Sequence, residues 1–264
     1  MLKKLTLLIS NLIEKPIPID KVIAERYQVI EYLGSGSYGH SYLVFDLLSK
    51  QRKVLKSLRF HKRITKSGRK GFTLEQKLLL SINHPGFPKY YEEGSFNKIP
   101  YYTMEYINGQ NFEQIIFQEG KKITEKEVFK IADELLQSIE FLHCQNIIHR
   151  DIRIPNVIYD GTNIRLIDLG LGRYLNQKNI DEIIGVDLRK EITYQADFYG
   201  LGHFLLFLLY SNFSFDDYMV EKSWEEELEI STEAKKIIKR LLQIELAYNH
   251  CAEIRADIKN LHYN

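Results

Sequence analysis

The order of strand-like and helix-like patterns constrains the fold of this chain more than any other feature of its sequence. The first third carries short segments of β-branched and aromatic residues, and strands are predicted over 27–33, 41–46 and 52–58, with a further pair over 92–106. One helical pattern, at 71–83, interrupts them. After Asn108 and Gly109, helices are predicted over 111–119, 124–145, 195–211 and 232–245, with a β-like interval over 146–169. This order predicts an α+β fold in two lobes, a small antiparallel β-sheet lobe with one main helix and a larger, mainly helical lobe.

The composition is that of an ordinary globular protein. The 264 residues are 44% hydrophobic and 27% charged, which excludes a disordered or low-complexity chain. The 36 Lys and Arg residues nearly balance the 35 Asp and Glu residues, leaving a formal net charge of +1. This balance argues against a dedicated nucleic-acid-binding protein.

The two cysteines, Cys144 and Cys251, do not form the framework of a disulfide-rich secreted domain. A zinc site would have to combine them with His143 and His250, but neither pair has the spacing of a metal-binding motif. We therefore expect packed or partly exposed thiols, with a metal site as the minor alternative.

The N-terminal segment resembles a signal peptide at first sight, because two lysines precede a short apolar stretch. It lacks a small-residue cleavage site and leads into charged residues and prolines. Its apolar residues have helical spacing, which predicts an amphipathic helix packed on the core and leaves a weak membrane-surface role as the alternative: Leu5, Leu8, Ile9, Leu12 and Ile13. The longest apolar run, 204–210, is too short to cross a membrane, so the expected compartment is the cytoplasm.

A glycine-rich turn, G-x-G-x-x-G at 34–39, separates the first two predicted strands. Dinucleotide-binding folds carry the same spacing, but there a helix follows the glycines, whereas here Ser41 begins a strand. Taken alone, the turn is equally consistent with a structural hairpin and with a hairpin that covers phosphates.

Two charged residues downstream of the turn fit a phosphate site. Lys56 lies in a predicted strand and would be a point charge against nucleotide phosphates, whereas Glu75 lies on the following helix and would hold that lysine in place. Taken singly, Lys56 would more often be a solvated strand residue, and Glu75 a surface charge.

The pattern at 149–170 favours a phosphate site over a structural turn and isolated surface charges. His149-Arg-Asp151 is followed by Asn156, and Asp168-Leu-Gly170 comes shortly after. Two carboxylates and an amide near β-like segments supply the hard oxygen ligands that suit Mg²⁺.

Together, the glycine turn, the strand lysine, the helix glutamate and these two motifs make the chain similar to the Hanks-type, eukaryotic-like protein kinases. It most resembles the small stand-alone bacterial serine/threonine kinases, without a sensor or transmembrane domain. The resemblance implies a two-lobed protein-kinase-like fold with an N-terminal segment at 1–26, an ATP-binding lobe at 27–106 and a catalytic and substrate lobe at 107–264. It implies transfer of the γ-phosphoryl of Mg-ATP, with Mn²⁺ as an alternative ion, to serine or threonine of proteins, including the kinase itself.

The resemblance also implies the roles of individual residues. The catalytic set is Asp151, Arg153 and Asn156, and the metal ligands are Asn156 and Asp168. The nucleotide-binding set is Leu33, Gly34, Ser35, Gly36, Ser37, Tyr38, Gly39, His40, Ser41, Lys56, Glu75, Glu105, Ile107, Asn111 and Ile158, with Met104 behind the adenine. Asp197, at the start of the helix over 195–211, would cap the backbone of the catalytic loop.

The chain departs from the family pattern in its substrate-binding features. Between Gly170 and Asp197 there is no A-P-E motif, and Asn249 stands where an arginine usually pairs with the glutamate of that motif. A small-molecule kinase and a pseudokinase scaffold are therefore the alternatives. Arg153 replaces the lysine usual in serine/threonine kinases, which leaves tyrosine as a second acceptor.

Two further features bear on regulation and partners. Arg150 is typical of kinases switched by a phosphate on the activation segment, where the acceptors here are Tyr174, Thr193 and Tyr194, but it would equally hold the loop through carbonyl groups. The segment 59–70 is basic, and is either a solvated connection or a docking site for an acidic partner. The expected partners are protein substrates, not nucleic acid.

Overall fold

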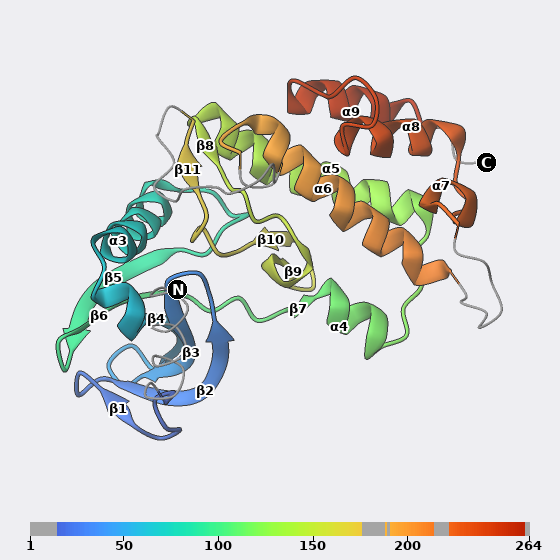
Figure 1. The fold of residues 1–264 in the computed structure, drawn as a ribbon. Helices are drawn as coiled ribbons and strands as arrows, with labels where there is room; N and C mark the ends of the chain where they lie inside the picture. The colour runs from blue at the N-terminus through green and yellow to red at the C-terminus, as the bar shows by residue number, and fades with distance from the viewer. Residues whose placement is uncertain (1–14, 176–187, 189–190, 214–221, 262–264) are drawn as a thin grey trace. The chain divides into compact units, whose positions relative to one another are not determined.

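The computed structural model describes residues 15–175, 188, 191–213 and 222–261 (Figure 1). The amphipathic helix predicted near the N-terminus, and most of the segment between Gly170 and Asp197, lie outside the described residues. The described chain forms two compact units. Unit 1 comprises 15–83, Pro88–Ile107 and Leu169–Leu171, and unit 2 comprises the remainder.

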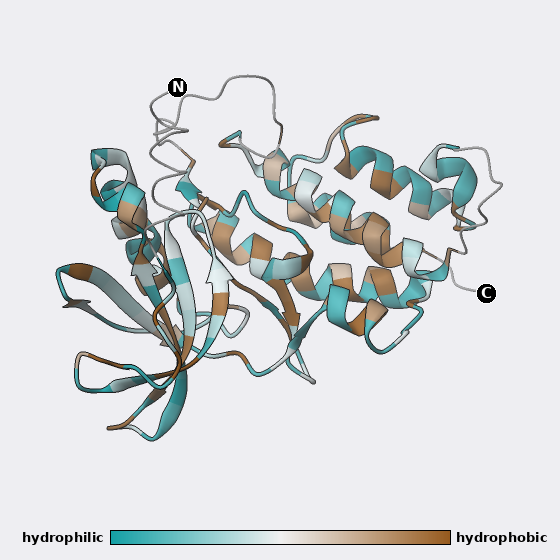
Figure 2. Cartoon of the chain, turned by 60° about the horizontal axis from the view of Figure 1, so that its bottom comes forward, coloured by the Kyte–Doolittle hydropathy of each residue, from teal (hydrophilic) through white to brown (hydrophobic). Residues whose placement is uncertain are grey.

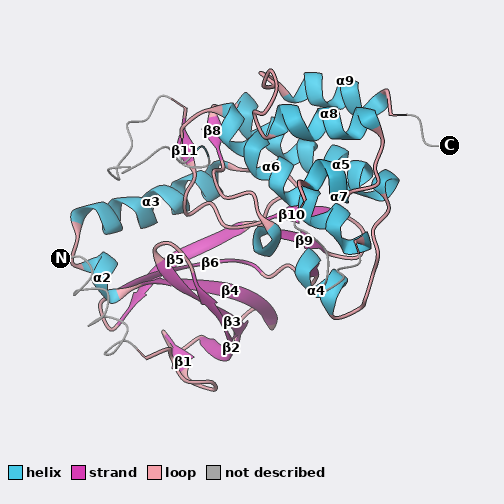
Figure 3. Cartoon of the chain, turned by 45° about the vertical axis from the view of Figure 1, so that its right-hand side comes forward, coloured by secondary structure: helices cyan, strands magenta, loops and turns pink. Residues whose placement is uncertain are grey.

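Unit 1 is built on one antiparallel sheet of six strands in the order β1-β2-β3-β4-β6-β5 (Figure 3). The strands are β1 (Val22–Ile23), β2 (Tyr27–Ser35), β3 (Gly39–Asp46), β4 (Gln51–Leu58), β5 (Tyr90–Phe96) and β6 (Ile99–Glu105). The predicted strands are thus confirmed. The turn between β5 and β6 lies at Asn97 and Lys98, which both have positive φ.

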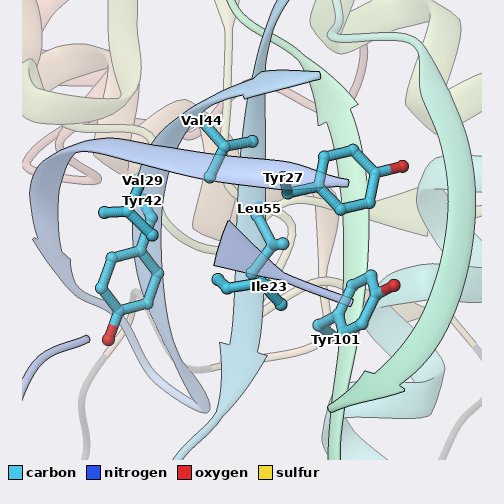
Figure 4. Packing of buried hydrophobic residues seen from close by; sticks show 7 residues of the cluster. All are labelled: Ile23, Tyr27, Val29, Tyr42, Val44, Leu55 and Tyr101. Atoms are coloured by element: carbon cyan, nitrogen blue, oxygen red, sulfur yellow. The ribbon is translucent and has the colours of Figure 1, made fainter. Parts of the chain in front are cut away.

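Alternate residues of neighbouring strands form the core of this sheet. A buried cluster joins residues that point to the same face, as Figure 4 shows: Ile23, Tyr27, Val29, Tyr42, Val44, Leu55 and Tyr101. Residues two apart on a strand share one face, so the spacing of Tyr27 and Val29, and of Tyr42 and Val44, explains why the predicted strands form this sheet.

A buried ion network lies beside this core. The guanidinium of Arg26 donates two hydrogen bonds of 2.8 Å to the Asp46 carboxylate, and Nζ of Lys53 lies 2.7 Å from the same group. Asp46 is completely buried. The hydrogen bonds from Arg26 hold the pKa of the Asp46 carboxyl well below its usual range, and the bond from Lys53 adds to this effect.

The main helix of unit 1 is α3 (Lys66–Ser81), and a short helix, α2 (Phe60–Arg63), precedes it. The prediction that the main helix begins at Gly71 is wrong. The hydroxyl of Thr65 accepts a hydrogen bond of 3.1 Å from the backbone N–H of Gly68, which caps the helix one turn earlier than its glycines suggest. The short α2 was not predicted, because four residues carry no detectable helical period.

Unit 2 is mainly helical. Its helices are α4 (Phe112–Phe117), α5 (Glu125–Cys144), α6 (Tyr194–Leu209), α7 (Trp224–Glu227), α8 (Thr232–Leu241) and α9 (Cys251–Lys259), with 3-10 turns at Ile154–Asn156 and Tyr210–Asn212. Apolar residues concentrate on α6 and on one face of α5 (Figure 2). Among the described residues, no helix is long and apolar enough to span a membrane.

Two small sheets complete unit 2. One has the order β10-β9-β7, with β7 (Gln110–Asn111), β9 (Val157–Tyr159) and β10 (Ile164–Leu166). The other pairs β8 (Ile147–Ile148) with β11 (Arg173–Tyr174). Of these strands, β8, β9 and β10 account for the β-like interval predicted over 146–169.

Local hydrogen bonding explains where the helices of unit 2 begin and end. A reciprocal capping box between Thr124 and Glu127 starts α5 where it was predicted. The prediction that α8 continues to residue 245 is wrong, because Gln243 adopts a φ of 60° just after the helix and turns the chain away.

Candidate active site

Glycine is required at two positions of the turn between β2 and β3. Gly34 has a φ of 131°, which side chains rarely allow. A Cβ on Gly39 would lie 2.8 Å from the carbonyl oxygen of Ser57, so glycine lets β3 approach β4 closely. The N–H of Gly36 donates to the carbonyl of Gly39 at 2.9 Å and closes the turn. The predicted residues 34–41 thus lie together at one end of this strand pair.

Tyr38, at the tip of the turn, is attached to the helices of unit 1. Its ring is buried and packs on Gly71 of α3, where an added Cβ would lie 2.3 Å from ring atoms. Nζ of Lys62 lies 4.9 Å from the ring centroid, and the Tyr38 carbonyl accepts a 3.0 Å hydrogen bond from the N–H of Arg59. The only sequence signal of this contact is a glycine inside a helical pattern.

Lys56 forms the predicted ion pair. On β4 its Nζ lies 2.5 Å from Oε1 of Glu75 on α3, and each side chain is only 2% exposed. The hydroxyl of Tyr102 on β6 donates to the same oxygen at 2.8 Å. Burial of a lysine requires such partners, so Glu75 and Tyr102 together fix the ammonium group. Tyr102 was not among the predicted site residues, although it lies directly opposite Lys56 in the pairing of β4 with β6.

The other nucleotide-site candidates of unit 1 lie at the ends of its strands. Leu33 is 43% exposed on β2, whereas Met104 and Ile107 are buried at and just after the end of β6. The N–H of Glu105 donates to the Lys89 carbonyl at 2.8 Å, so that part of the chain is fixed.

Asn111 and Ile158, predicted to contact ribose and base, pair with each other in unit 2. Oδ1 of Asn111 accepts a 2.9 Å hydrogen bond from the N–H of Gln114 and thereby caps α4. This bond uses one lone pair of the oxygen, so its second lone pair and the amide nitrogen of Asn111 are the groups left for a ribose contact.

The predicted catalytic residues lie together in the loop that follows β8. Nδ2 of Asn156 donates to both the carbonyl and Oδ2 of Asp151, each at 2.9 Å. Nε of Arg153 lies 2.9 Å from the other oxygen, Oδ1. The Asp151 carboxylate is thus held on both sides. Its side chain is 15% exposed, so it is still accessible.

Asp197 at the start of α6 caps the backbone of this loop, as expected. Its carboxylate accepts hydrogen bonds from the N–H groups of His149 at 2.9 Å and Arg150 at 2.7 Å, and from Nε2 of His143 at 2.8 Å. Burial alone would raise the pKa of Asp197, but the hydrogen bond from His143 and the other donors outweigh burial and lower it.

Arg150 and Asp168 have positive φ values of 66° and 65°. Such backbone strain in residues other than glycine concentrates at functional sites, where the surrounding structure holds it. The N–H of Ile167 donates to the Asn156 carbonyl at 2.9 Å and so connects the two predicted metal ligands, Asn156 and Asp168, through the backbone.

His143 and Cys251 contact each other, with Sγ of Cys251 3.9 Å from Nδ1 of His143. The described residues contain no group of three or more His, Cys, Asp or Glu side chains placed to hold a metal ion. Burial raises the pKa of the Cys251 thiol to about 12, whereas Cys144 is exposed.

Comparison with known proteins assigns this arrangement to a family. The sequence profile described as "Protein kinase domain" matches residues 27–258, which is most of the chain. The chain belongs to the protein kinase family. The Hanks-type resemblance is thereby confirmed.

The relatives of this kinase include bacterial serine/threonine kinases. It is 37% identical to "Probable serine/threonine-protein kinase YbdM" of Bacillus subtilis over 96% of both chains. It is 29% identical to "Serine/threonine-protein kinase PrkC" of the same organism, over 75% of this chain and 32% of that protein.

Solved structures confirm the predicted fold of the kinase. The crystal structure of the Mycobacterium tuberculosis PknI kinase domain matches with a TM-score of 0.69 at 19% identity, over 92% of this chain and 98% of that one. The α+β, protein-kinase-like fold, with a sheet lobe and a helical lobe, is therefore shown.

Proposed function

We propose that this kinase transfers the γ-phosphoryl group of ATP to serine or threonine hydroxyls of proteins, including its own. The observation that carries the proposal is the Asp151 carboxylate, held by Asn156 and Arg153 in a chain of the kinase family. The serine/threonine kinases among its relatives support the choice of acceptor. The intact Lys56–Glu75 pair argues against a pseudokinase scaffold.

The residues present fit a nucleotide with a divalent ion. The carboxylate of Asp168 and the amide oxygen of Asn156 are hard oxygen ligands, which suit Mg²⁺ or Mn²⁺. When bound, the ion would neutralise phosphate charge. The Lys56 ammonium would contact the phosphates, and the glycine turn would let backbone N–H groups approach them.

The protein residues have separate tasks in the proposed reaction. Asp151 would orient the acceptor hydroxyl and accept its proton. Asn156 would keep the Asp151 carboxylate in position through its amide N–H groups, and Arg153 would place a positive charge beside the same carboxylate. Glu75 would hold Lys56 in place.

The proposal also assigns a role to each part of the chain. Residues 27–106 would bind the nucleotide and residues 107–264 would bind the acceptor and carry the catalytic loop, preceded by an N-terminal segment at 1–26. The protein would act on protein substrates in the cytoplasm.

The test is transfer of label from γ-labelled ATP with Mg²⁺ or Mn²⁺ to the kinase and to casein. We expect label on serine and threonine, lost in Lys56→Ala and in Asp168→Asn but kept in Lys50→Ala, which changes an exposed lysine. Label on tyrosine would contradict the acceptor, and label only on small metabolites would support a small-molecule kinase. No transfer with either ion would support a scaffold.

A further inference from the structure

The exposed face of α3 carries four basic residues. Lys66, Arg69, Lys70 and Lys77 are all exposed and recur at helical spacing, so they share one face. The segment 47–74 contains no Asp or Glu, and the one acidic residue of α3, Glu75, is buried against Lys56. The face therefore carries four cations and no acid.

The charges on this face oppose the helix dipole. The first turn of α3 contains Lys66 and no acidic residue, although the N-terminal end of a helix favours negative charge. The Thr65 hydroxyl, which is uncharged, caps this end of the helix. An anionic group beside the first turns of α3 would relieve this repulsion.

Another basic helix of the same chain shows a different arrangement. In α8, Lys239 lies 2.5 Å from Glu225 and Arg240 lies 2.6 Å from Asp257, and Glu233 occupies the first turn. No described acidic residue forms an ion pair with any of the four cations of α3. The four cations of α3 thus lack, within the described chain, the acidic partners that Lys239 and Arg240 of α8 have.

We propose that the basic face of α3 docks an acidic segment of a protein substrate. The inference rests on the proposed function, whose substrate class it names. Lys66 to Lys77 spans about 16 Å at 1.5 Å per residue, the length of about five residues of an extended peptide. Leu80, 66% exposed, continues the same face one turn later, so the face combines charge with an apolar contact. This combination suits a polypeptide better than a nucleic-acid backbone.

The direct test is binding, independent of catalysis. The anisotropy of fluorescein-labelled poly-L-glutamate is measured with the full chain at low salt. The test variant is K66E/R69E/K70E, and the control K50E/R52E/K98E reverses three exposed charges elsewhere in unit 1 and changes the net charge equally. We expect about tenfold weaker binding in the test variant, loss of wild-type binding at high salt, and little change in the control.

Equal affinity in the test variant and the wild type, or equal weakening in the control, would overturn the proposal. So would tighter, variant-sensitive binding of duplex DNA or anionic vesicles.

Kinetics separate this inference from the proposed function. With casein as an acidic acceptor, the test variant should raise KM about tenfold with kcat unchanged, whereas KM for myelin basic protein should not rise. Failure of the wild type to phosphorylate either protein would contradict the proposed function, while the poly-L-glutamate measurement would still decide the docking surface.

Discussion

Gly71→Ala is expected to destabilise the kinase, although alanine is the better helix former. Gly71 lies inside α3, where replacing glycine by alanine ordinarily stabilises a helix by about 1 kcal/mol. Here the new Cβ would lie 2.3 Å from two ring atoms of Tyr38, well inside van der Waals contact. Since the backbone of α3 is fixed by its own hydrogen bonds, the ring has to move.

The size of the effect follows from the burial of Tyr38. The residue is 4% exposed, and returning a large apolar side chain to water costs about 2–3 kcal/mol. Subtracting the helix gain leaves a net loss of about 1–2 kcal/mol, or roughly 2–4 °C in Tm for a chain of this size. In a Tyr38→Ala background the clash is absent, so the same substitution should raise Tm.

The assay is a double-mutant cycle by thermal unfolding, with Thr73→Ala as a control at an exposed position of the same helix. We expect opposite signs for Gly71→Ala in the two backgrounds and a small rise in Tm for the control. An increase in Tm on Gly71→Ala with Tyr38 present, or the same change in both backgrounds, would refute the packing of the glycine turn on α3.

Three further predictions concern buried groups. Because the folded pKa of Asp46 is lowered, its contribution to stability is complete above its unfolded pKa near 4 and is lost as pH falls from there toward the folded pKa. Asp46→Asn should therefore cost about 3 kcal/mol at pH 7 and clearly less at pH 3, as urea titrations at the two pH values will show. Cys144 should react with iodoacetamide at pH 8 in the native protein and Cys251 only after unfolding, so a native mass spectrum with two adducts would contradict the burial of Cys251. Asp197→Asn should lower kcat with little change in the KM of ATP, and unchanged kcat would show that the catalytic loop does not depend on the cap.

The sequence was sufficient to predict features that depend on local patterns and on family motifs. Strand alternation placed β2, β3 and β4, and the helical pattern over 124–145 placed α5. The spacing of motifs paired Lys56 with Glu75, although the two are far apart in the chain. These features are predictable because each depends on residue types at fixed separations.

Features that depend on tertiary contacts could not be predicted. The packing of Tyr38 on Gly71 requires knowing that the glycine turn reaches α3, and the hydrogen bond from Tyr102 requires the register of β6. The start of α3 was missed because Gly68 and Gly71 lower the helical propensity there, whereas the cap from Thr65 decides the boundary.

The most direct test of the role assigned to Asp151 is a comparison of chemistry with nucleotide binding in Asp151→Asn. Asparagine keeps the size of the side chain and removes the proton acceptor. We predict that kcat for phosphorylation of casein falls by a factor of at least about 10² while the calorimetric Kd of Mg-ATP stays within about threefold of the wild type. A variant that retains kcat within a few-fold of the wild type would contradict the account.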